Sequence, residues 1–397
     1  MTGRRGPSPG RSDAMPATLK LLLLLALLNQ ALKTGSNVTI LLTALNQQAS
    51  PFLVGALTAV TGIFPMLLAV SIGRLNDRFG ARVPMLAGSA LVILSTLLPT
   101  VWPGLAALFV TATVTSLGAM AFSVSVQNTV GHVGSSDRAK NFSWLSMAFS
   151  FGGIIGPLFA GAIIDLAGHE TAFKLLAFLP LVALILVGTG RLKLPAPHKA
   201  EGPAEGATTG ESKAARRTLD LLKNPKMRII YLLTALHVSA WEVISFLVPV
   251  YGSGIGISAS SIGLILGAFN AATFVVRIVL PVFSRRYASL TLIRASLVLA
   301  GMISILFPLV TSVPLLVTLA FILGMGLGVT QPLAMSVLHE SAPDGRSGEA
   351  VGLRTAVVNL SGTTTPIIYG ALGGVFGMLP VFWGCGIGIW VAVWALR

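Results

Sequence analysis

The sequence contains few charged residues: only 10% of its 397 residues are Asp, Glu, Lys or Arg. A soluble chain usually carries about a quarter, and 54% of this chain is hydrophobic. The core of a water-soluble protein cannot bury so large a fraction of apolar side chains, so most of the protein surface must face lipid. Cysteine is nearly absent as well, since Cys385 is the single one. That count excludes an internal disulfide and a cysteine-based metal cluster.

The chain also lacks the glycine-rich phosphate-binding pattern that an ATP-driven pump needs. Its His, Cys and carboxylate residues show no spacing typical of a metal site. We therefore expect a protein that is not an enzyme and that holds neither a metal nor a cofactor. The net charge of +14 would suggest nucleic acid in a soluble protein, but here the placement of that charge decides its meaning.

Long hydrophobic runs are abundant. A helix that crosses a bilayer needs about 20 mostly apolar residues, and lipid-facing backbone must satisfy its own hydrogen bonds. We therefore predict an all-α polytopic membrane protein with twelve transmembrane helices in two pseudo-symmetric six-helix bundles. The predicted spans are 18–45, 51–73, 83–101, 104–130, 142–165, 171–190, 229–252, 258–284, 291–311, 314–338, 350–374 and 377–396.

Residues 193–226 are rich in Pro, Gly, Ala and charge, which predicts a flexible cytoplasmic linker. It follows an N-terminal tail (1–17) and a first bundle (18–192), and it precedes a second bundle (227–397).

Lysine and arginine indicate the orientation. With the N-terminus inside, 23 of the 27 basic residues fall in cytoplasmic segments, as the positive-inside rule requires. The positive charge is then topological, and nucleic acid is not an expected partner. We expect a multi-pass protein of the cell (inner) membrane, monomeric, with both termini in the cytoplasm and the lipid bilayer around it.

The two halves match in sequence. The turn at 73–82 has a counterpart 208 residues later, and Pro157 has a counterpart 209 residues later in Pro366. Two alignments at nearly one offset indicate a duplicated six-helix unit. Transporters built from parallel repeats place their binding site between the repeats, near the middle of the membrane.

The turn GRLNDRFGAR resembles the loop signature between helices two and three of the major facilitator superfamily. Its glycines allow a tight turn, and its aspartate can cap a neighbouring helix or pair with an arginine to lock an inner gate. The resemblance implies that superfamily's fold and alternating access; the alternative is a merely charged turn. The matching residues are Gly73, Arg74, Asp77, Arg78, Gly80 and Arg82.

The segment GGIIGPLFAG resembles the superfamily's antiporter signature through Gly152, Gly156, Pro157 and Gly161. Small residues let helices approach closely and proline bends a helix, so the resemblance implies a tight seam suited to exchange or efflux. Generic small-residue packing is the alternative. The similarity extends to the twelve-helix drug/proton antiporters, although Val114 stands where those proteins usually carry an arginine.

Four ionisable residues lie well inside predicted spans: Lys33, Glu242, Arg277 and Arg354. Such residues are costly in lipid and are functional candidates by default. Glu242 is the one carboxylate near the predicted midplane. Burial disfavours the charged form of a carboxyl group, so Glu242 is a candidate proton carrier, with an ion pair to Arg277 or Lys33 as the alternative. Arg354 lies nearer its span end, where snorkelling to the interface is favoured.

A polar stripe marks the candidate substrate cavity. Asn29, Lys33 and Asn37 recur every four residues and so share one helix face. Residues 208 positions later in the second half include His237 and Trp241. The full set of cavity candidates is Asn29, Gln30, Lys33, Asn37, His237, Trp241, Arg277 and Gln331.

Lys33 and Arg277 also occupy places similar to substrate-binding residues of the monocarboxylate transporters in this superfamily. That resemblance implies an electropositive cavity for an anionic or zwitterionic solute. The leading hypothesis is a secondary active exporter of a small organic molecule, coupled to protons. The alternatives are an importer or facilitator of organic anions that uses Lys33 and Arg277, and a non-transporting receptor or channel.

Overall fold

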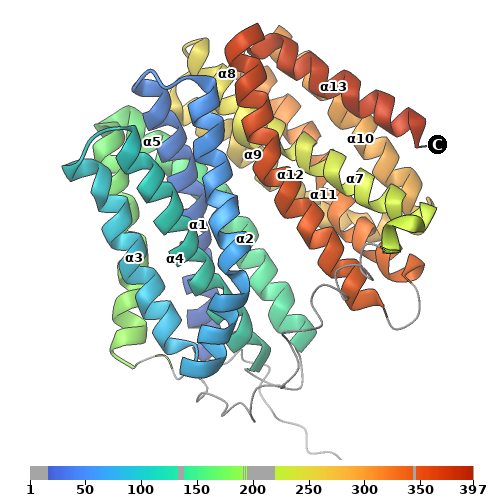
Figure 1. Ribbon diagram of the computed structural model, residues 1–397. Helices are drawn as coiled ribbons and strands as arrows, with labels where there is room; N and C mark the ends of the chain where they lie inside the picture. The colour runs from blue at the N-terminus through green and yellow to red at the C-terminus, as the bar shows by residue number, and fades with distance from the viewer. Residues whose placement is uncertain are drawn as a thin grey trace, which may run out of the picture.

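The structure, a computed structural model, describes residues 17–132, 138–190, 192, 194, 220–342 and 346–396. Within these ranges the regular structure is helical and contains no strand, which confirms the all-α prediction. Figure 1 shows two helical bundles side by side, one blue to green and the other yellow to red. Ten of the described helices are long and apolar enough to cross a membrane.

The first bundle comprises the first five helices. They are α1 (Ala17–Asn46), α2 (Pro51–Phe79), α3 (Arg82–Val101), α4 (Leu105–His132) and α5 (Arg138–Gly188). α5 contains two membrane passes, because its backbone leaves helical geometry at Gly168 (φ 83°, ψ 169°). The predicted break between the spans 142–165 and 171–190 falls at this glycine.

The second bundle begins with α7 (Pro225–Glu242), which continues through a π-helical turn, η2 (Val243–Leu247), into α8 (Val248–Gly254). The remaining elements are α9 (Ala259–Phe283), α10 (Ser289–Leu306), the short 3₁₀ turn η3 (Phe307–Leu309), α11 (Val313–Ser341), α12 (Ser347–Phe376) and α13 (Met378–Ala395). α12 is not among the ten apolar helices, because it carries a polar face.

Counting the second pass of α5 and adding α12 to the ten apolar helices gives twelve passes in the described ranges, six in each bundle. Most of the predicted linker and nearly all of the predicted N-terminal tail lie outside the described residues. The described end of the linker forms the short 3₁₀ helix η1 (Asp220–Lys223) before α7 begins.

Local geometry repeats between the bundles at the offset found in the sequence. Gly377, 209 residues after Gly168, has nearly the same backbone angles (φ 82°, ψ 168°). Both lie in the left-handed region that favours glycine. Ser50 and Ser258, 208 residues apart, cap α2 and α9 by accepting the N–H of the third following residue. Each bundle is therefore built from the same chain pattern.

The bundles meet through two pairs of helices, α2 with α12 and α5 with α9. A side chain at Gly55 or Gly370 would overlap the backbone of the facing helix, at Pro366 and Pro51 respectively. Gly263 and Gly161 pack in the same way against the backbones of Pro157 and Ala259. The four contacts are related by the repeat, and they seal the end of the protein at which α2 and α9 begin. We call this the closed end.

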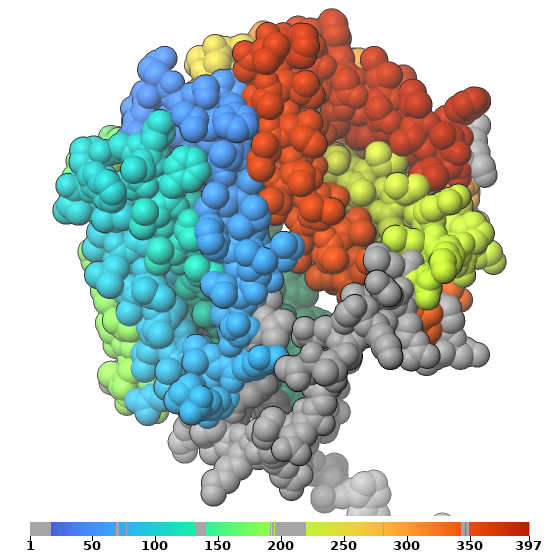
Figure 2. Space-filling view, in the orientation of Figure 1, coloured from blue at the N-terminus to red at the C-terminus, as the bar shows by residue number. Residues whose placement is uncertain are grey.

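Toward the other end the bundles separate. Figure 2 shows α2 and α12 in contact in the upper part of the view and diverging below. This second end, where α2 and α11 finish, we call the open end.

Candidate functional site

A cavity of about 690 Å³ lies between the bundles. Helices α1, α2, α7, α9, α11 and α12 all contribute to its wall. Its volume suits a small organic molecule. Its wall combines apolar side chains, such as Leu57 and Leu266, with polar and charged groups.

The structure brings six of the eight predicted cavity residues to this wall. They are Gln30, Lys33, Asn37, His237, Trp241 and Gln331. Lys33 and Asn37 are exposed to the cavity space, whereas His237 is 8% exposed. Residues of α1 and α7, which are 208 positions apart in sequence, thus face the same space.

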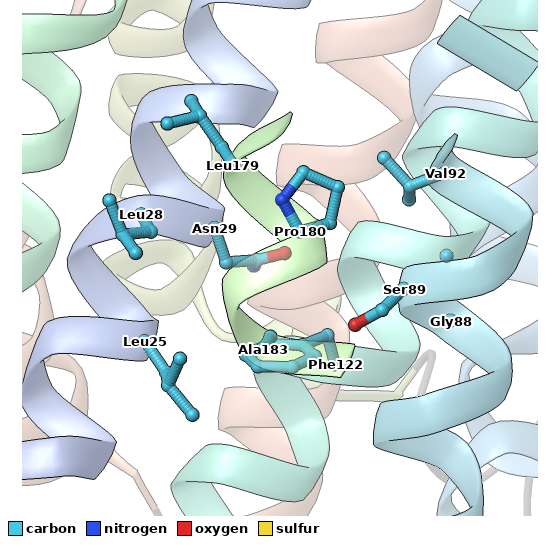
Figure 3. A pocket seen from close by; sticks show the side chains of 11 residues that line it. Leu25, Leu28, Asn29, Gly88, Ser89, Val92, Phe122, Leu179, Pro180 and Ala183 are labelled. Atoms are coloured by element: carbon cyan, nitrogen blue, oxygen red, sulfur yellow. The ribbon is translucent and has the colours of Figure 1, made fainter. Parts of the chain in front are cut away.

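Asn29 is not part of the cavity. It is buried within the first bundle, where its Nδ2 donates to Ala119 O at 3.2 Å and to Ser123 Oγ at 3.0 Å on α4. Figure 3 shows Asn29 among side chains of α1, α3, α4 and α5. These side chains surround a gap of about 10 Å³. Each four-residue step turns an α-helix by about 40°, so a stripe that faces the cavity at Asn37 has rotated into the bundle by Asn29.

Arg277 is not among the residues that line the cavity. It lies half-buried on α9, and its Nε atom is buried without a hydrogen-bond partner among the described residues. Its predicted role in substrate binding has no support from this placement.

The arginine that lines the cavity is Arg354, whereas the sequence predicted Arg277. Arg354 is 8% exposed and lines the cavity from α12, whereas snorkelling would have left it at the interface. The signal that could have found it is a second polar stripe: Thr355, Asn359 and Thr363 recur every four residues beside it and also line the cavity.

Glu242 lines the cavity at the end of α7, immediately before the π-helical turn η2. Single π-helical turns are rare and are frequent at functional sites. Ser245 Oγ donates to Glu242 Oε2 at 3.0 Å. Across the part of the chain that the structure describes, no ion pair joins Glu242 to Lys33 or Arg277, so the structural ion pair considered as an alternative is not formed.

Aromatic rings continue the wall beside these groups. The ring centroids of His237 and Trp241 are 5.9 Å apart, and those of Trp241 and Phe269 are 4.7 Å apart in an edge-to-face arrangement. Trp241 therefore presents a flat apolar surface between His237 on α7 and Phe269 on α9.

The antiporter-like segment makes two seams at once. Gly152 and Gly156 pack against the backbone of α1, where a side chain would overlap Leu27 O and Ala31 O. Pro157 and Gly161 pack against α9 in the other bundle. The small residues thus join α5 to a partner in each bundle, beside the cavity.

The gate-like turn lies at the open end. Gly80 (φ 73°) ends α2, and Arg82 donates from its guanidinium to Gly188 O at 2.9 Å, which ties α3 to the end of α5. Arg74 and Arg78 are exposed, and a side chain at Gly73 would meet open space. The side chain of Asp77 lies outside the described residues.

The closed end carries an additional contact that the sequence did not indicate. Asp165 on α5 accepts the backbone N–H groups of Ala259 at 3.0 Å and Ser260 at 2.7 Å, the first two residues of α9. A carboxylate at a helix N-terminus satisfies free N–H groups and complements the helix dipole. The residue 209 positions later is Gly374, so the pseudo-equivalent seam between α12 and α2 has no such carboxylate.

We expect Asp165→Ala to weaken the closed end. Loss of a helix cap costs about 1 kcal/mol, which corresponds to about a fivefold shift toward states open at that end. Thiol labelling of an Asn37→Cys variant from the closed-end side measures this shift. Glu170→Ala, which removes an exposed acid paired with Lys174, is the control, and equal labelling in both variants would refute the role of Asp165.

Comparison with known proteins places this geometry in a family. The sequence profile of the Major Facilitator Superfamily matches residues 22–366. The quinolone resistance protein NorA of Staphylococcus aureus (strain MRSA252) is 23% identical over 340 residues, covering 84% of each chain. The class D tetracycline resistance protein of Salmonella ordonez is 25% identical over 332 residues, covering 79% of this chain and 78% of the relative.

Solved structures share the fold. A POT family transporter in complex with 5-aminolevulinic acid superposes with a TM-score of 0.78 at 15% identity, covering 97% of this chain and 96% of that one. A bacterial homologue of the human lysosomal transporter Spinster, in an inward-facing and unoccupied conformation, gives a TM-score of 0.75 at 13% identity, covering 96% and 97%. With the matched profile spanning both bundles and the cavity between them, the chain belongs to the major facilitator superfamily of membrane transporters.

Proposed function

We propose that this transporter is a secondary active exporter of a small organic molecule, coupled to protons and working by alternating access. The observation that carries the proposal is a cavity of about 690 Å³ between two pseudo-symmetric bundles that are sealed against each other at one end. The antiporter-like seams and the similarity to quinolone and tetracycline resistance proteins favour export.

We further propose that the open end faces the cytoplasm. The described segments at this end carry basic residues, including Arg78, Lys140, Lys226 and Arg286, and the positive-inside rule places such segments in the cytoplasm. An exporter would load its solute in this state. Asp77 would then lock the gate-like turn when the cytoplasmic end closes, because a carboxylate can cap a helix of the other bundle.

Coupling is assigned to Glu242, the acidic group of the cavity wall. A carboxyl group that alternately faces the two compartments can carry one proton per cycle, provided that protonation changes which state is stable. The Ser245 hydroxyl contacts one carboxylate oxygen, which leaves the other oxygen available to a proton or a solute.

The second candidate is an importer or facilitator of organic anions. Lys33, which is exposed to the cavity, favours it, whereas the position of Arg277 outside the cavity wall does not.

Reconstitution into proteoliposomes distinguishes these functions. Flux of a quinolone or a tetracycline that dissipates an imposed pH gradient would support the exporter. Anion uptake that is lost in Lys33→Ala would support the importer. Absence of flux for every solute tested would leave a receptor or channel as the remaining class.

A further inference from the structure

We infer that Arg354 and His237 form a carboxylate-binding subsite in the central cavity, and that its ligands are organic anions with a flat apolar body that packs on Trp241. The inference rests on the proposed function in one respect, because it treats the cavity as the place where the solute binds.

Two buried polar side chains line the cavity, and one nitrogen atom of each lacks a hydrogen-bond partner among the described residues. Arg354 and His237 are each 8% exposed, and both line the cavity. Arg354 Nε and His237 Nδ1 are buried with no hydrogen-bond partner among the described residues. A buried cation or ring nitrogen without a partner is unfavourable, so an acceptor supplied by a ligand would complete the site.

The two groups lie on neighbouring helices and act on each other. α7 and α12 pack together, and Arg354 and Arg277 are both close enough to exert an electrostatic effect on the His237 ring. A guanidinium presents a planar pair of N–H donors that matches the geometry of a carboxylate. One ring nitrogen of His237 can add a further donor.

The charges around the subsite favour an anion. Among the described residues that line the cavity, the charged groups are Lys33, Arg354 and Glu242, besides the histidine. No ion pair is formed between Glu242 and either cation in that part of the chain. Glu242 is five residues beyond His237 on α7, about 7 Å further along the helix and on a different side. The carboxylate of Glu242 therefore does not neutralise the positive charge of the subsite.

The surroundings select the rest of the ligand. Trp241 lies directly beside His237, and Phe269 packs edge-to-face against it. A carboxylate held by Arg354 and His237 would place an attached ring against this aromatic surface, where stacking and burial of apolar area add affinity.

A matched pair of probes tests the subsite without transport. 2-Naphthoate and 2-naphthamide share one shape and differ in the charge of the group that would meet Arg354. Binding to the detergent-purified full chain is measured by calorimetry and by quenching of tryptophan fluorescence. We expect the wild type to bind naphthoate at least about tenfold more tightly than naphthamide, because a hydrogen bond to a charged group is worth that much or more.

Variants then test whether the preference for naphthoate over naphthamide depends on Arg354. Arg354→Gln should abolish the preference for naphthoate, whereas Arg354→Lys should keep the preference at reduced affinity, since the charge remains and the planar fork is lost. Arg286→Gln, which removes an exposed arginine at the open end that does not line the cavity, should leave the preference unchanged. If Arg354→Gln does not fold, His237→Leu is the second test variant. We expect it to lose more affinity for naphthoate than for naphthamide.

Equal binding of the two probes by the wild type, no binding of naphthoate, or an undiminished preference in Arg354→Gln would overturn the inference. The proposed function has a separate readout: naphthoate binding with this dependence, together with no flux of any solute tested, would leave the subsite standing and refute transport. Proton-driven flux of a neutral solute, without any preference for anions, would support the proposed function and refute the subsite.

Discussion

Glu242→Gln is expected to abolish uphill, proton-driven accumulation of solute while sparing counterflow exchange. Glutamine keeps the size and hydrogen-bonding capacity of a protonated glutamate but cannot release a proton. The substituted transporter can still reorient with solute bound, whereas the link between the proton gradient and the direction of transport is lost. Accumulation in proteoliposomes with an imposed pH gradient, compared with exchange of labelled for unlabelled solute at equal pH, measures the two activities.

The matched control for this variant is Glu170→Gln. Glu170 is exposed and pairs with Lys174 near the closed end, so its neutralisation should leave both activities close to those of the wild type. Unchanged accumulation in Glu242→Gln would remove Glu242 as the proton carrier.

The second large effect is expected at the glycines that seal the closed end. In Gly370→Val the new side chain would overlap the backbone of Pro51 in the other bundle. Overlap of this kind costs about 1–3 kcal/mol, which shifts the balance between two states by about 5- to 150-fold. The state closed at this end becomes rare, and turnover falls by a similar factor because that state is part of every cycle.

Gly374→Val separates this effect from the effect of valine on the helix. Gly374 lies one turn further along α12, and a side chain there would meet open space. We expect Gly374→Val to fold and turn over nearly as the wild type does. Similar turnover in the two variants would show that the seal at Pro51 is not needed for transport.

Most of the fold follows from the sequence because hydrophobic length and repeat spacing are strong signals. The structure also repeats backbone geometry and helix contacts between the bundles, and the residue types alone predict these only in part. Gly168 and Gly377 end corresponding helices with the same left-handed backbone, and the glycine–proline seams follow the same offset.

The residues of the site were harder to predict from the sequence, for two physical reasons. Helical stripes drift, so Asn29 turns into the first bundle although it is in register with Lys33 and Asn37. Distance from a span end is also a poor guide to burial: Arg354, near the start of α12, faces the cavity, whereas Arg277 does not. The contact of Asp165 with α9 depends on how the bundles meet, which no local pattern encodes.

In the proposed cycle the bundles rock about the cavity, so that one end opens as the other closes. Pulsed electron paramagnetic resonance tests it with two label pairs in a variant whose Cys385 is replaced by alanine. Leu166 and Phe376, which are 86% and 65% exposed, report on the closed end, and Thr189 and His339, both exposed, report on the open end. On moving from neutral to acidic pH or adding solute, we expect the first distance to lengthen as the second shortens. Distances that change together, or that hold constant through turnover, would contradict alternating access.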